Sequence, residues 1–287
     1  MTRALTPCPP QLPDVWAAGQ AYEPFMGRWS RLVAREFIDW LALPPGARWL
    51  DIGCGTGALT QTIAARARPA AVIGLDPSDG FVAFAERDAG SHHIVFLTGD
   101  AQSLPFPDRT FDAVVSGLVL NFVPDPVRAA AEMKRVLRPG GTAGCYVWDY
   151  AGEMQLIRHF WRAAAALDPA AQALDEARRF PLCDPERLRA LFDDCGFERT
   201  ECRIIDVPTV FRDFDDYWAP FLGRQGPAPT YCGTLSDGRR AALRERLRAA
   251  LPVEPDGSIR LMARTFAVRG IRPAVSGGAA FDKEREG

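Results

Sequence analysis

Short apolar runs alternate with amphipathic segments between about residue 45 and residue 149 of the 287-residue chain. The apolar runs are rich in β-branched residues and predict strands at 48–53, 71–76, 94–99, 111–118 and 141–149. The segments between them predict helices at 56–68, 79–89 and 126–137, the last with Asp125 as N-cap and a stop at 138–141. Because several strands are apolar throughout, the pattern predicts a doubly wound α/β fold, with helices on both faces of a parallel sheet.

The pattern changes after residue 149, where long stretches without a strand separate two further strand-like runs. Helix and loop predominate at 150–183 and 210–257, a capped helix covers 184–196, and apolar runs recur at 202–207 and 259–270. We interpret 45–272 as one domain in which 150–183 and 210–257 are insertions that cover the substrate. Residues 1–44 form an N-terminal segment with an amphipathic lid helix at 21–37, and residues 273–287 form a flexible polar tail.

The charge and hydropathy of the chain indicate which kinds of binding partner to expect. A formal net charge of -2, a pI of about 6.0 and 24% charged residues give no basic face for nucleic acid. No apolar run reaches the roughly 18 residues of a membrane span, and the N-terminus lacks the apolar core of a secretory signal. Seven cysteines without a CxxC pair indicate reduced thiols. We therefore expect a cytoplasmic monomer or homodimer that acts on a small molecule, without a metal, nucleic acid or membrane.

The segment 51–57, DIGCGTG, lies where the first predicted strand leads into the first helix. Glycines let a ligand approach the backbone there, and the N-terminus of the following helix favours an anionic or oxygen-rich group. Gly53, Gly55 and Ala58, with Asp76 closing the second strand, also match the dinucleotide-binding pattern. The loop alone therefore leaves an NAD(P)-dependent oxidoreductase open.

Three acidic residues distinguish the two kinds of ligand. Asp51, Asp76 and Asp100 close the first, second and third predicted strands. The carboxyl ends of parallel strands meet at one edge of the sheet, so these carboxylates are expected around one crevice. Such a crevice suits a ligand with an amine, a ribose diol and an exocyclic amino group better than it suits a pyrophosphate.

Four motifs carry a resemblance to a known family: DIGCGTG at 51–57, VIGLDPS at 72–78, GDA at 99–101 and RVLRPGG at 135–141. Together they resemble class I S-adenosylmethionine-dependent methyltransferases, of the small-molecule branch that includes quinone-biosynthesis enzymes. The resemblance extends over about residues 20–150. It implies a Rossmann-like, seven-stranded, mostly parallel sheet with helical insertions after strands 5 and 6, and it implies that 259–270 is an antiparallel strand at the sheet edge.

The resemblance also implies the cofactor, S-adenosyl-L-methionine, its product S-adenosyl-L-homocysteine, and a role for each matched residue. Asp76 takes the ribose diol, Pro77 packs near adenine, and Asp100 accepts from the adenine amino group beside a backbone contact from Ala101. Tyr22 faces the sulfonium, and Arg28 reaches the methionine carboxylate. The expected cofactor-binding residues are Tyr22, Arg28, Asp51, Gly53, Cys54, Gly55, Thr56, Gly57, Asp76, Pro77, Asp100, Ala101, Ser116, Gly117 and Leu118.

The acceptor side is less defined by sequence. Methyl transfer from a sulfonium is an in-line displacement that mainly requires alignment and exclusion of water, and a base helps when the acceptor is a hydroxyl or an acidic carbon. We expect Asp149, Tyr150 or His159 to fill that role. Aromatic residues in the two insertions predict an apolar cover for a small apolar or aromatic acceptor; they are Phe160, Trp161, Phe211, Phe214, Tyr217, Trp218 and Phe221.

Two alternatives remain beside a small-molecule methyltransferase. An NAD(P)-dependent oxidoreductase shares the glycine loop and Asp76, but leaves Asp51 and Asp100 unexplained. A cofactor-binding protein of the same fold without transfer activity fits the motifs equally well, because this chemistry has no obligatory catalytic residue.

Overall fold

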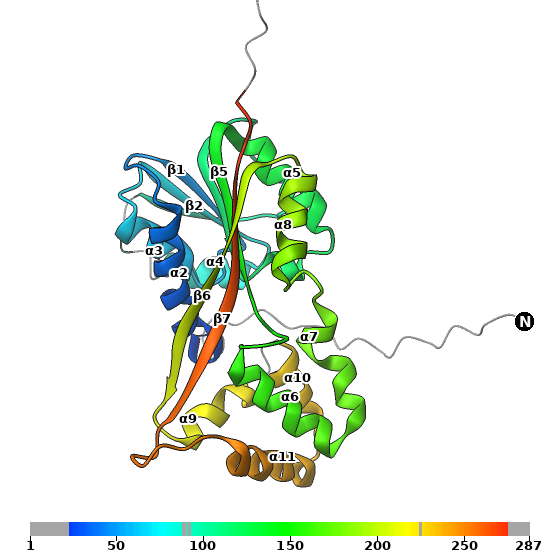
Figure 1. The fold of residues 1–287 in the computed structure, drawn as a ribbon. Helices are drawn as coiled ribbons and strands as arrows, with labels where there is room; N and C mark the ends of the chain where they lie inside the picture. The colour runs from blue at the N-terminus through cyan, green and yellow to red at the C-terminus, as the bar shows by residue number, and fades with distance from the viewer. Residues whose placement is uncertain (1–22, 88–89, 91–92, 224–225, 275–287) are drawn as a thin grey trace, which may run out of the picture.

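The computed structural model describes residues 23–87, 90, 93–223 and 226–274. Its centre is a seven-stranded sheet of order β3-β2-β1-β4-β5-β7-β6 (Figure 1). The strands are β1 (Arg48–Ile52), β2 (Ala71–Asp76), β3 (Ile94–Thr98), β4 (Phe111–Gly117), β5 (Leu137–Trp148), β6 (Glu198–Phe211) and β7 (Ile259–Ile271). All pairs from β3 to β5 are parallel, and β7 is antiparallel to both of its neighbours. The predicted fold class is confirmed.

One expectation about the sheet is wrong. The antiparallel strand β7 does not lie at the edge but between β5 and β6, and β6 is the edge strand. Pairing sets this position, because Thr142–Trp148 of β5 pairs with one side of β7 and Glu198–Phe211 of β6 pairs with the other.

Helices cover both faces of the sheet. The helix α2 packs beside α3 on one side, and α5 packs beside α8 on the other (Figure 1). None of the helices within the described residues is long and apolar enough to cross a membrane. The helical segments are η1 (Glu23–Gly27), α2 (Arg28–Leu41), α3 (Ala58–Arg66), α4 (Asp79–Arg87), η2 (Leu120–Phe122), α5 (Pro126–Val136), α6 (Gln155–Leu167), η3 (Pro169–Leu174), α7 (Glu176–Arg179), α8 (Pro185–Asp194), α9 (Phe214–Trp218), η4 (Ala219–Leu222), α10 (Pro227–Thr234) and α11 (Asp237–Ala250).

The junction between α5 and β5 follows the predicted start and stop signals with one difference. The Asp125 carboxylate accepts from the Arg128 amide at 2.9 Å and caps α5, as expected. The strand begins at Leu137, earlier than predicted, because Leu137 pairs with Phe111 and Thr142 pairs with Ala113. Residues 138–141 are therefore a bulge inside β5 rather than a turn before it.

A two-stranded ribbon carries a helical lobe beyond the carboxyl edge of the sheet. The last pair between β5 and β7 is Trp148 with Thr265, whereas β6 and β7 continue to pair as far as Phe211 with Ile259. The helices α6, α9, α10 and α11 gather at this end, in the lower half of Figure 1. The lobe thus lies on the side of the sheet where open α/β folds bind ligands.

Candidate functional site

The glycine loop between β1 and α3 adopts a backbone that its sequence permits. Gly53, Gly55 and Gly57 have φ angles of +71°, +53° and +85°. A Cβ at Gly53 would lie 2.4 Å from the Val119 side chain, so packing requires glycine there, whereas a Cβ at Gly55 would meet nothing within 4 Å. The loop is held to β2 because the Gly53 and Cys54 amides donate to the Leu75 carbonyl at 2.7 and 3.0 Å.

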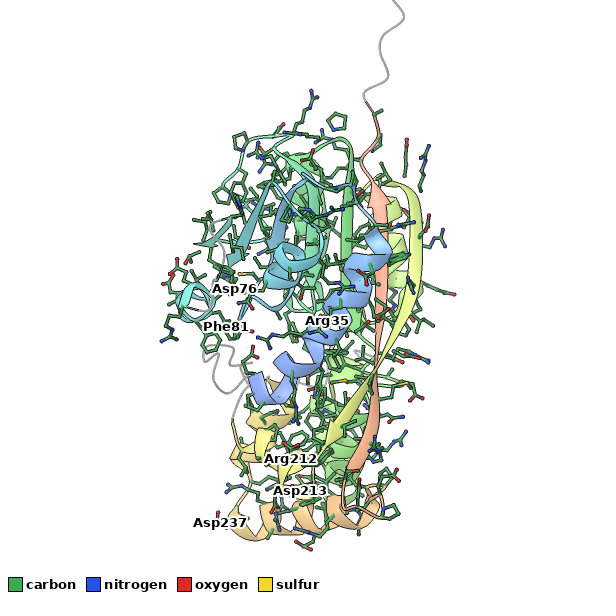
Figure 2. The ribbon with its side chains drawn as sticks, turned by 90° about the vertical axis from the view of Figure 1, so that its left-hand side faces the viewer. Arg35, Asp76, Phe81, Arg212, Asp213 and Asp237 are labelled. Carbon is green, nitrogen blue, oxygen red and sulfur yellow. The ribbon has the colours of Figure 1, made fainter. Side chains whose placement is uncertain are left out.

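Asp76 fixes the other side of this loop from the end of β2. Its Oδ2 accepts from the Gly55 amide and its Oδ1 from the Ser78 amide, both at 2.9 Å. Burial raises the pKa of this carboxyl above its ordinary value, and the two amides oppose the rise. Figure 2 shows Asp76 and Phe81 together at the end of the sheet that faces the lobe carrying Arg212 and Asp213.

Asp51 lies behind the loop and is fully buried. Its Oδ2 accepts from the Thr60 hydroxyl at 2.6 Å, and its Oδ1 is buried without a hydrogen-bond partner among the described residues. Burial is the main cause that raises the pKa of Asp51 to about 7, and the charge of Asp76 adds to the rise. A buried acceptor without a protein partner is usually satisfied by ordered water, an ion or a ligand.

A cleft opens between the glycine loop, Asp76 and the ends of β4 and β5. Its lining is mostly apolar, and Asp76 is its only Asp, Glu, Lys, Arg or His within the part of the chain that the structure describes. The lining residues are Met26, Ser30, Gly53, Cys54, Gly55, Thr56, Ala58, Leu59, Asp76, Pro77, Ser78, Phe81, Gly117, Leu118, Val119, Phe122, Tyr146, Trp148 and Tyr150.

Aromatic side chains form one wall of this cleft. Tyr146 and Trp148 at the end of β5 and Tyr150 just after it alternate along the chain and line the cleft, as does Phe122 of η2. We name these four residues the aromatic wall. Only Tyr150 was predicted as a site residue from the sequence, although the period-two spacing of aromatic residues in YVWDY indicates that all three share one face of the strand. Leu118 joins this wall to β4 with a φ of +64°, an unusual conformation for a branched side chain.

The start of the N-terminal helical segment closes another side of the cleft. Met26 and Ser30 line it, and the Glu23 carboxylate accepts from the Thr56 hydroxyl at 2.5 Å. Glu23 also forms an ion pair with Arg31. Tyr22, which the resemblance places near the sulfonium, lies outside the described residues.

About half of the predicted cofactor-binding residues line the cleft directly. They are Gly53, Cys54, Gly55, Thr56, Asp76, Pro77, Gly117 and Leu118. Asp51 lies behind the loop, and Gly57 forms the N-cap of α3.

Arg28 does not face the cleft. Its guanidinium pairs with Asp216 of α9 at 3.2 Å and lies 4.3 and 4.8 Å from the ring centroids of Trp29 and Phe211. This arrangement does not place it at a methionine carboxylate. The partner comes from a segment 188 residues away, and no local pattern indicated it.

Asp100, Ala101 and Ser116 also lie outside the lining. The Asp100 carboxylate is exposed and accepts from the Gln102 amide at 2.8 Å. Ala101 is buried, and the Ser116 hydroxyl is fully buried and donates to the Ile52 carbonyl at 2.8 Å. Ser116 therefore ties β4 to β1 in this structure.

Of the three candidate bases, only Tyr150 lines the cleft. The Asp149 carboxylate accepts from the Gly152 and Glu153 amides at 2.8 and 2.9 Å and stabilises the turn after β5. His159 lines a separate hollow with Arg162 and other residues, and burial, followed by the Arg162 charge, lowers its pKa.

The aromatic residues of the two insertions contact one another rather than the cleft. Phe160 stacks on Phe221 with ring centroids 4.5 Å apart, and Phe211 meets Tyr217 edge-on at 5.3 Å. All the predicted cover residues are buried, and none lines the cleft. They form the core of the helical lobe, which is continuous with the main hydrophobic core because α6 packs on β7 and α9 packs on β6.

Comparison with known proteins gives the class of this chain. The family model described as "Methyltransferase domain" matches residues 50–145. A demethylmenaquinone methyltransferase of Symbiobacterium thermophilum is 31% identical over 206 residues, which cover 64% of this chain and 81% of that protein. A 2-phytyl-1,4-naphtoquinone methyltransferase of Thermosynechococcus vestitus is 36% identical over 184 residues, covering 57% and 78%. A malonyl-[acyl-carrier protein] O-methyltransferase of Serratia marcescens is 32% identical over 223 residues, covering 75% and 78%.

Solved structures agree on the fold. The phosphoethanolamine N-methyltransferase 2 of Haemonchus contortus, in complex with S-adenosyl-L-methionine, aligns with a TM-score of 0.56 at 18% identity over 89% of this chain and 56% of that chain.

The chain belongs to the class I S-adenosylmethionine-dependent methyltransferases. It transfers a methyl group from S-adenosylmethionine to a small acceptor, and the oxidoreductase alternative is set aside.

The residues of the cleft fit this cofactor. Behind the cleft, the Oδ1 of Asp51 has no hydrogen-bond partner among the described residues, and a Cβ at Gly55 would meet no atom of those residues within 4 Å. Both features are what a ligand with an amine and a ribose needs from this edge of the sheet.

Proposed function

We propose that the acceptor is a planar, apolar small molecule of the quinone or quinol type. The observation that carries this proposal is the aromatic wall, whose four aromatic side chains line one side of the cleft. A planar apolar ring binds beside aromatic side chains by stacked or edge-on contacts and by burial of apolar area. The names of the relatives from Symbiobacterium thermophilum and Thermosynechococcus vestitus support the same class of acceptor.

The charge of the cleft argues against an anionic acceptor such as the one named for the Serratia marcescens relative. Carboxylates and phosphates are recognised by arginine, lysine or ordered amides. No Lys, Arg or His lines the cleft within the described residues, so no cationic side chain there would pair with an anion. A neutral acceptor therefore matches the cleft better than a carboxylate does.

For the cofactor, we propose that Asp76 binds the ribose diol and that Asp51 faces the methionine amine from behind the glycine loop. Pro77 and Phe81 flank the adenine end, and Gly117 and Leu118 border the methionine end. Asp100 and Ala101, which follow β3 at the same edge, stay predictions for the adenine amino group. Tyr22 stays a prediction for the sulfonium.

For the chemistry, the bound cofactor supplies an already activated methyl group. The chain's own task is to orient the acceptor and to exclude water. We propose that the Tyr150 hydroxyl orients an oxygen of the acceptor and that the aromatic wall holds its ring. Asp149 and His159 have no part in this proposal, because their side chains do not reach the cleft. We also propose that the protein acts in the cytoplasm as a monomer or homodimer, without nucleic acid.

A panel of acceptors tests this function. The protein is incubated with S-adenosylmethionine and either reduced 1,4-naphthoquinone or a malonyl thioester, and products are analysed by mass spectrometry. We expect a methylated naphthoquinol together with S-adenosylhomocysteine, and no malonyl methyl ester. Methylation of the malonyl thioester alone would overturn the proposal.

A further inference from the structure

A partly hidden ion pair lies directly behind the aromatic wall. The Arg158 Nη1 donates to both carboxylate oxygens of Asp175, at 2.7 and 2.8 Å, and to the Tyr150 carbonyl at 3.1 Å. The two side chains are only 14% and 11% exposed. The Arg158 guanidinium thus connects three parts of the chain. They are its own helix α6, Tyr150 at the end of the aromatic wall, and Asp175 in the loop before α7.

Asp175 connects this ion pair to a short helix. Its Oδ1 also accepts from the Ala177 amide at 3.0 Å and so caps α7. A second attachment comes from the next residue, because the Trp161 indole donates to the buried Glu176 carboxylate. The start of α7 is therefore fixed to α6 at two adjacent residues.

The other end of α7 reaches the aromatic wall. Phe180, whose amide donates to the Glu176 carbonyl at 3.0 Å, packs edge-on against Phe122 with ring centroids 4.7 Å apart. Its centroid also lies 6.0 Å from that of Tyr150. Phe122 and Tyr150 both line the cleft, so Phe180 supports two of the four wall residues from behind.

We propose that Arg158 and Asp175 are positioning residues for the acceptor: they set the aromatic wall by fixing the Tyr150 backbone directly and Phe122 through α7 and Phe180. This inference rests on the proposed function, since it assigns the acceptor to that wall. Neither side chain lines the cleft, and both act through residues that do.

The energetics favour positioning over stability as the use of this pair. Burying two charges costs several kcal/mol per ion, and their attraction offsets this cost only when all donors and acceptors are satisfied. Here the Arg158 Nε is buried without a partner among the described residues. A well-packed apolar pair would avoid that cost, but it would not hold the Tyr150 carbonyl.

Three variants separate the contributions. Arg158→Met removes the cation, Arg158→Lys keeps a cation that reaches one site at a time, and Asp175→Asn removes the charge while its amide oxygen still caps α7. The control is Arg272→Met. Arg272 donates to the Lys134 and Arg135 carbonyls at 2.7 and 2.8 Å near the start of β5, at the opposite end of that strand from the cleft.

The measurements are the affinity for S-adenosylhomocysteine and the KM and kcat for reduced 1,4-naphthoquinone. Because small misplacements of a reacting group are costly, we expect Arg158→Met to raise the acceptor KM by about tenfold or more and to leave cofactor affinity unchanged. Asp175→Asn should raise the acceptor KM in the same way, and Arg158→Lys should raise it less than Arg158→Met does. Arg272→Met should lower thermal stability only. An unchanged acceptor KM in Arg158→Met, or an equal loss of cofactor affinity, would overturn the proposal.

A wrong assignment of the acceptor would give a different experimental result from a wrong assignment of Arg158 and Asp175. If the unmodified protein does not methylate reduced 1,4-naphthoquinone, the acceptor assignment is wrong. Binding of 1,4-naphthoquinone itself, followed by quenching of tryptophan fluorescence, then tests the positioning role. Weaker quenching in Arg158→Met supports that role, and identical or absent quenching in both proteins rejects it.

Discussion

Asp76 combines two roles at the level of a single residue. Its two oxygens accept from the Gly55 and Ser78 amides and so shape the glycine loop, while the same carboxylate lines the cleft. A carboxylate has about four acceptor positions, so it can serve the backbone and a ribose diol at once.

Replacement of Asp76 should therefore weaken cofactor binding strongly. Asp76→Ala removes two charge-assisted hydrogen bonds to the ribose, each worth about 1.5–3 kcal/mol, and we expect S-adenosylhomocysteine affinity to fall by on the order of a hundredfold or more. The control is Asp237→Ala at the fully exposed start of α11, far from the cleft in Figure 2. Equal affinities in the two variants would reject the ribose assignment.

Asp51 should make cofactor binding depend on pH. Its pKa is raised from 3.8 to about 7, so near pH 6 much of the ligand-free protein holds this carboxyl protonated. Only the ionised form attracts the methionine amine, so S-adenosylhomocysteine affinity should rise between about pH 6 and pH 8. The unfolded chain loses this proton first, and the free energy of unfolding contributed by Asp51 therefore falls as pH rises from about 4 to about 7. Asp51→Asn should flatten both profiles, and a persistent slope would assign it to another group.

Gly53 and Gly55 should respond differently to alanine. Gly53→Ala places a Cβ 2.4 Å from Val119 and should destabilise the fold. Gly55→Ala meets no protein atom, so beyond a backbone cost of about 1 kcal/mol its Cβ should mainly obstruct the cofactor. Thermal melts and titrations with S-adenosylhomocysteine separate the two effects. The opposite ranking would contradict the description of this loop.

At the scale of elements, the sequence predicted β1 to β4 to within a residue, because each is a short apolar run between clear breakers. It predicted β6 as 202–207, whereas the strand covers Glu198–Phe211. As the edge strand, β6 alternates buried Ile205, Val207, Thr209 and Phe211 with exposed residues, whereas Glu201–Ile204 before them is exposed throughout and breaks the pattern. The position of β7 between two strands depends on pairing over long sequence distances, which no local pattern encodes.

The residues of the site, like the strands, were predicted from the sequence only where a local motif marks them. The glycine loop and Asp76 are local motifs and were found. The orientation of Tyr146 and Trp148 depends on which face of β5 meets the cleft, and this depends on the register with β4 and β7. The partner of Arg28 comes from the far lobe. Residues placed by tertiary pairing were therefore missed, and residues placed by a motif were identified.

Alternation along β5 gives a prediction at this scale. Trp148 lines the cleft, whereas its neighbour Val147 points to the opposite face and is fully buried. Trp148→Leu should raise the KM for reduced 1,4-naphthoquinone and leave S-adenosylhomocysteine affinity within about twofold. Val147→Ala should cost about 1–3 kcal/mol of stability, with little change in that KM. Similar kinetics in both variants would contradict the assignment of the aromatic wall.

At the scale of the whole molecule, the helical lobe and the sheet are joined at more than the β6–β7 ribbon. The ion pair between Arg28 of α2 and Asp216 of α9 links the helix that borders the cleft to the lobe, and the Trp29 and Phe211 rings flank its guanidinium. The exposed fractions of the two side chains are 29% and 17%, so solvent screens the pair only in part.

Loss of this link should destabilise the molecule measurably. Arg28→Met should lower the free energy of unfolding by about 1–3 kcal/mol, since it leaves the partly buried Asp216 with only the exposed Arg212, 3.9 Å away, as a cationic partner. The control is Arg66→Met, which breaks an ion pair with Asp39 whose side chains are 43% and 51% exposed, and should cost less than about 1 kcal/mol. Urea denaturation measures both. Equal losses would show that the lobe is not held through Arg28.

The most direct test of the site is calorimetric titration of the protein and its Asp76→Ala variant with S-adenosylhomocysteine, NAD and NADP. The cleft described here should bind S-adenosylhomocysteine with a Kd in the micromolar range or tighter, should bind neither dinucleotide, and should lose that affinity in Asp76→Ala. Binding of a nicotinamide dinucleotide, or equal binding of S-adenosylhomocysteine by the variant, would contradict the assignment of the cleft.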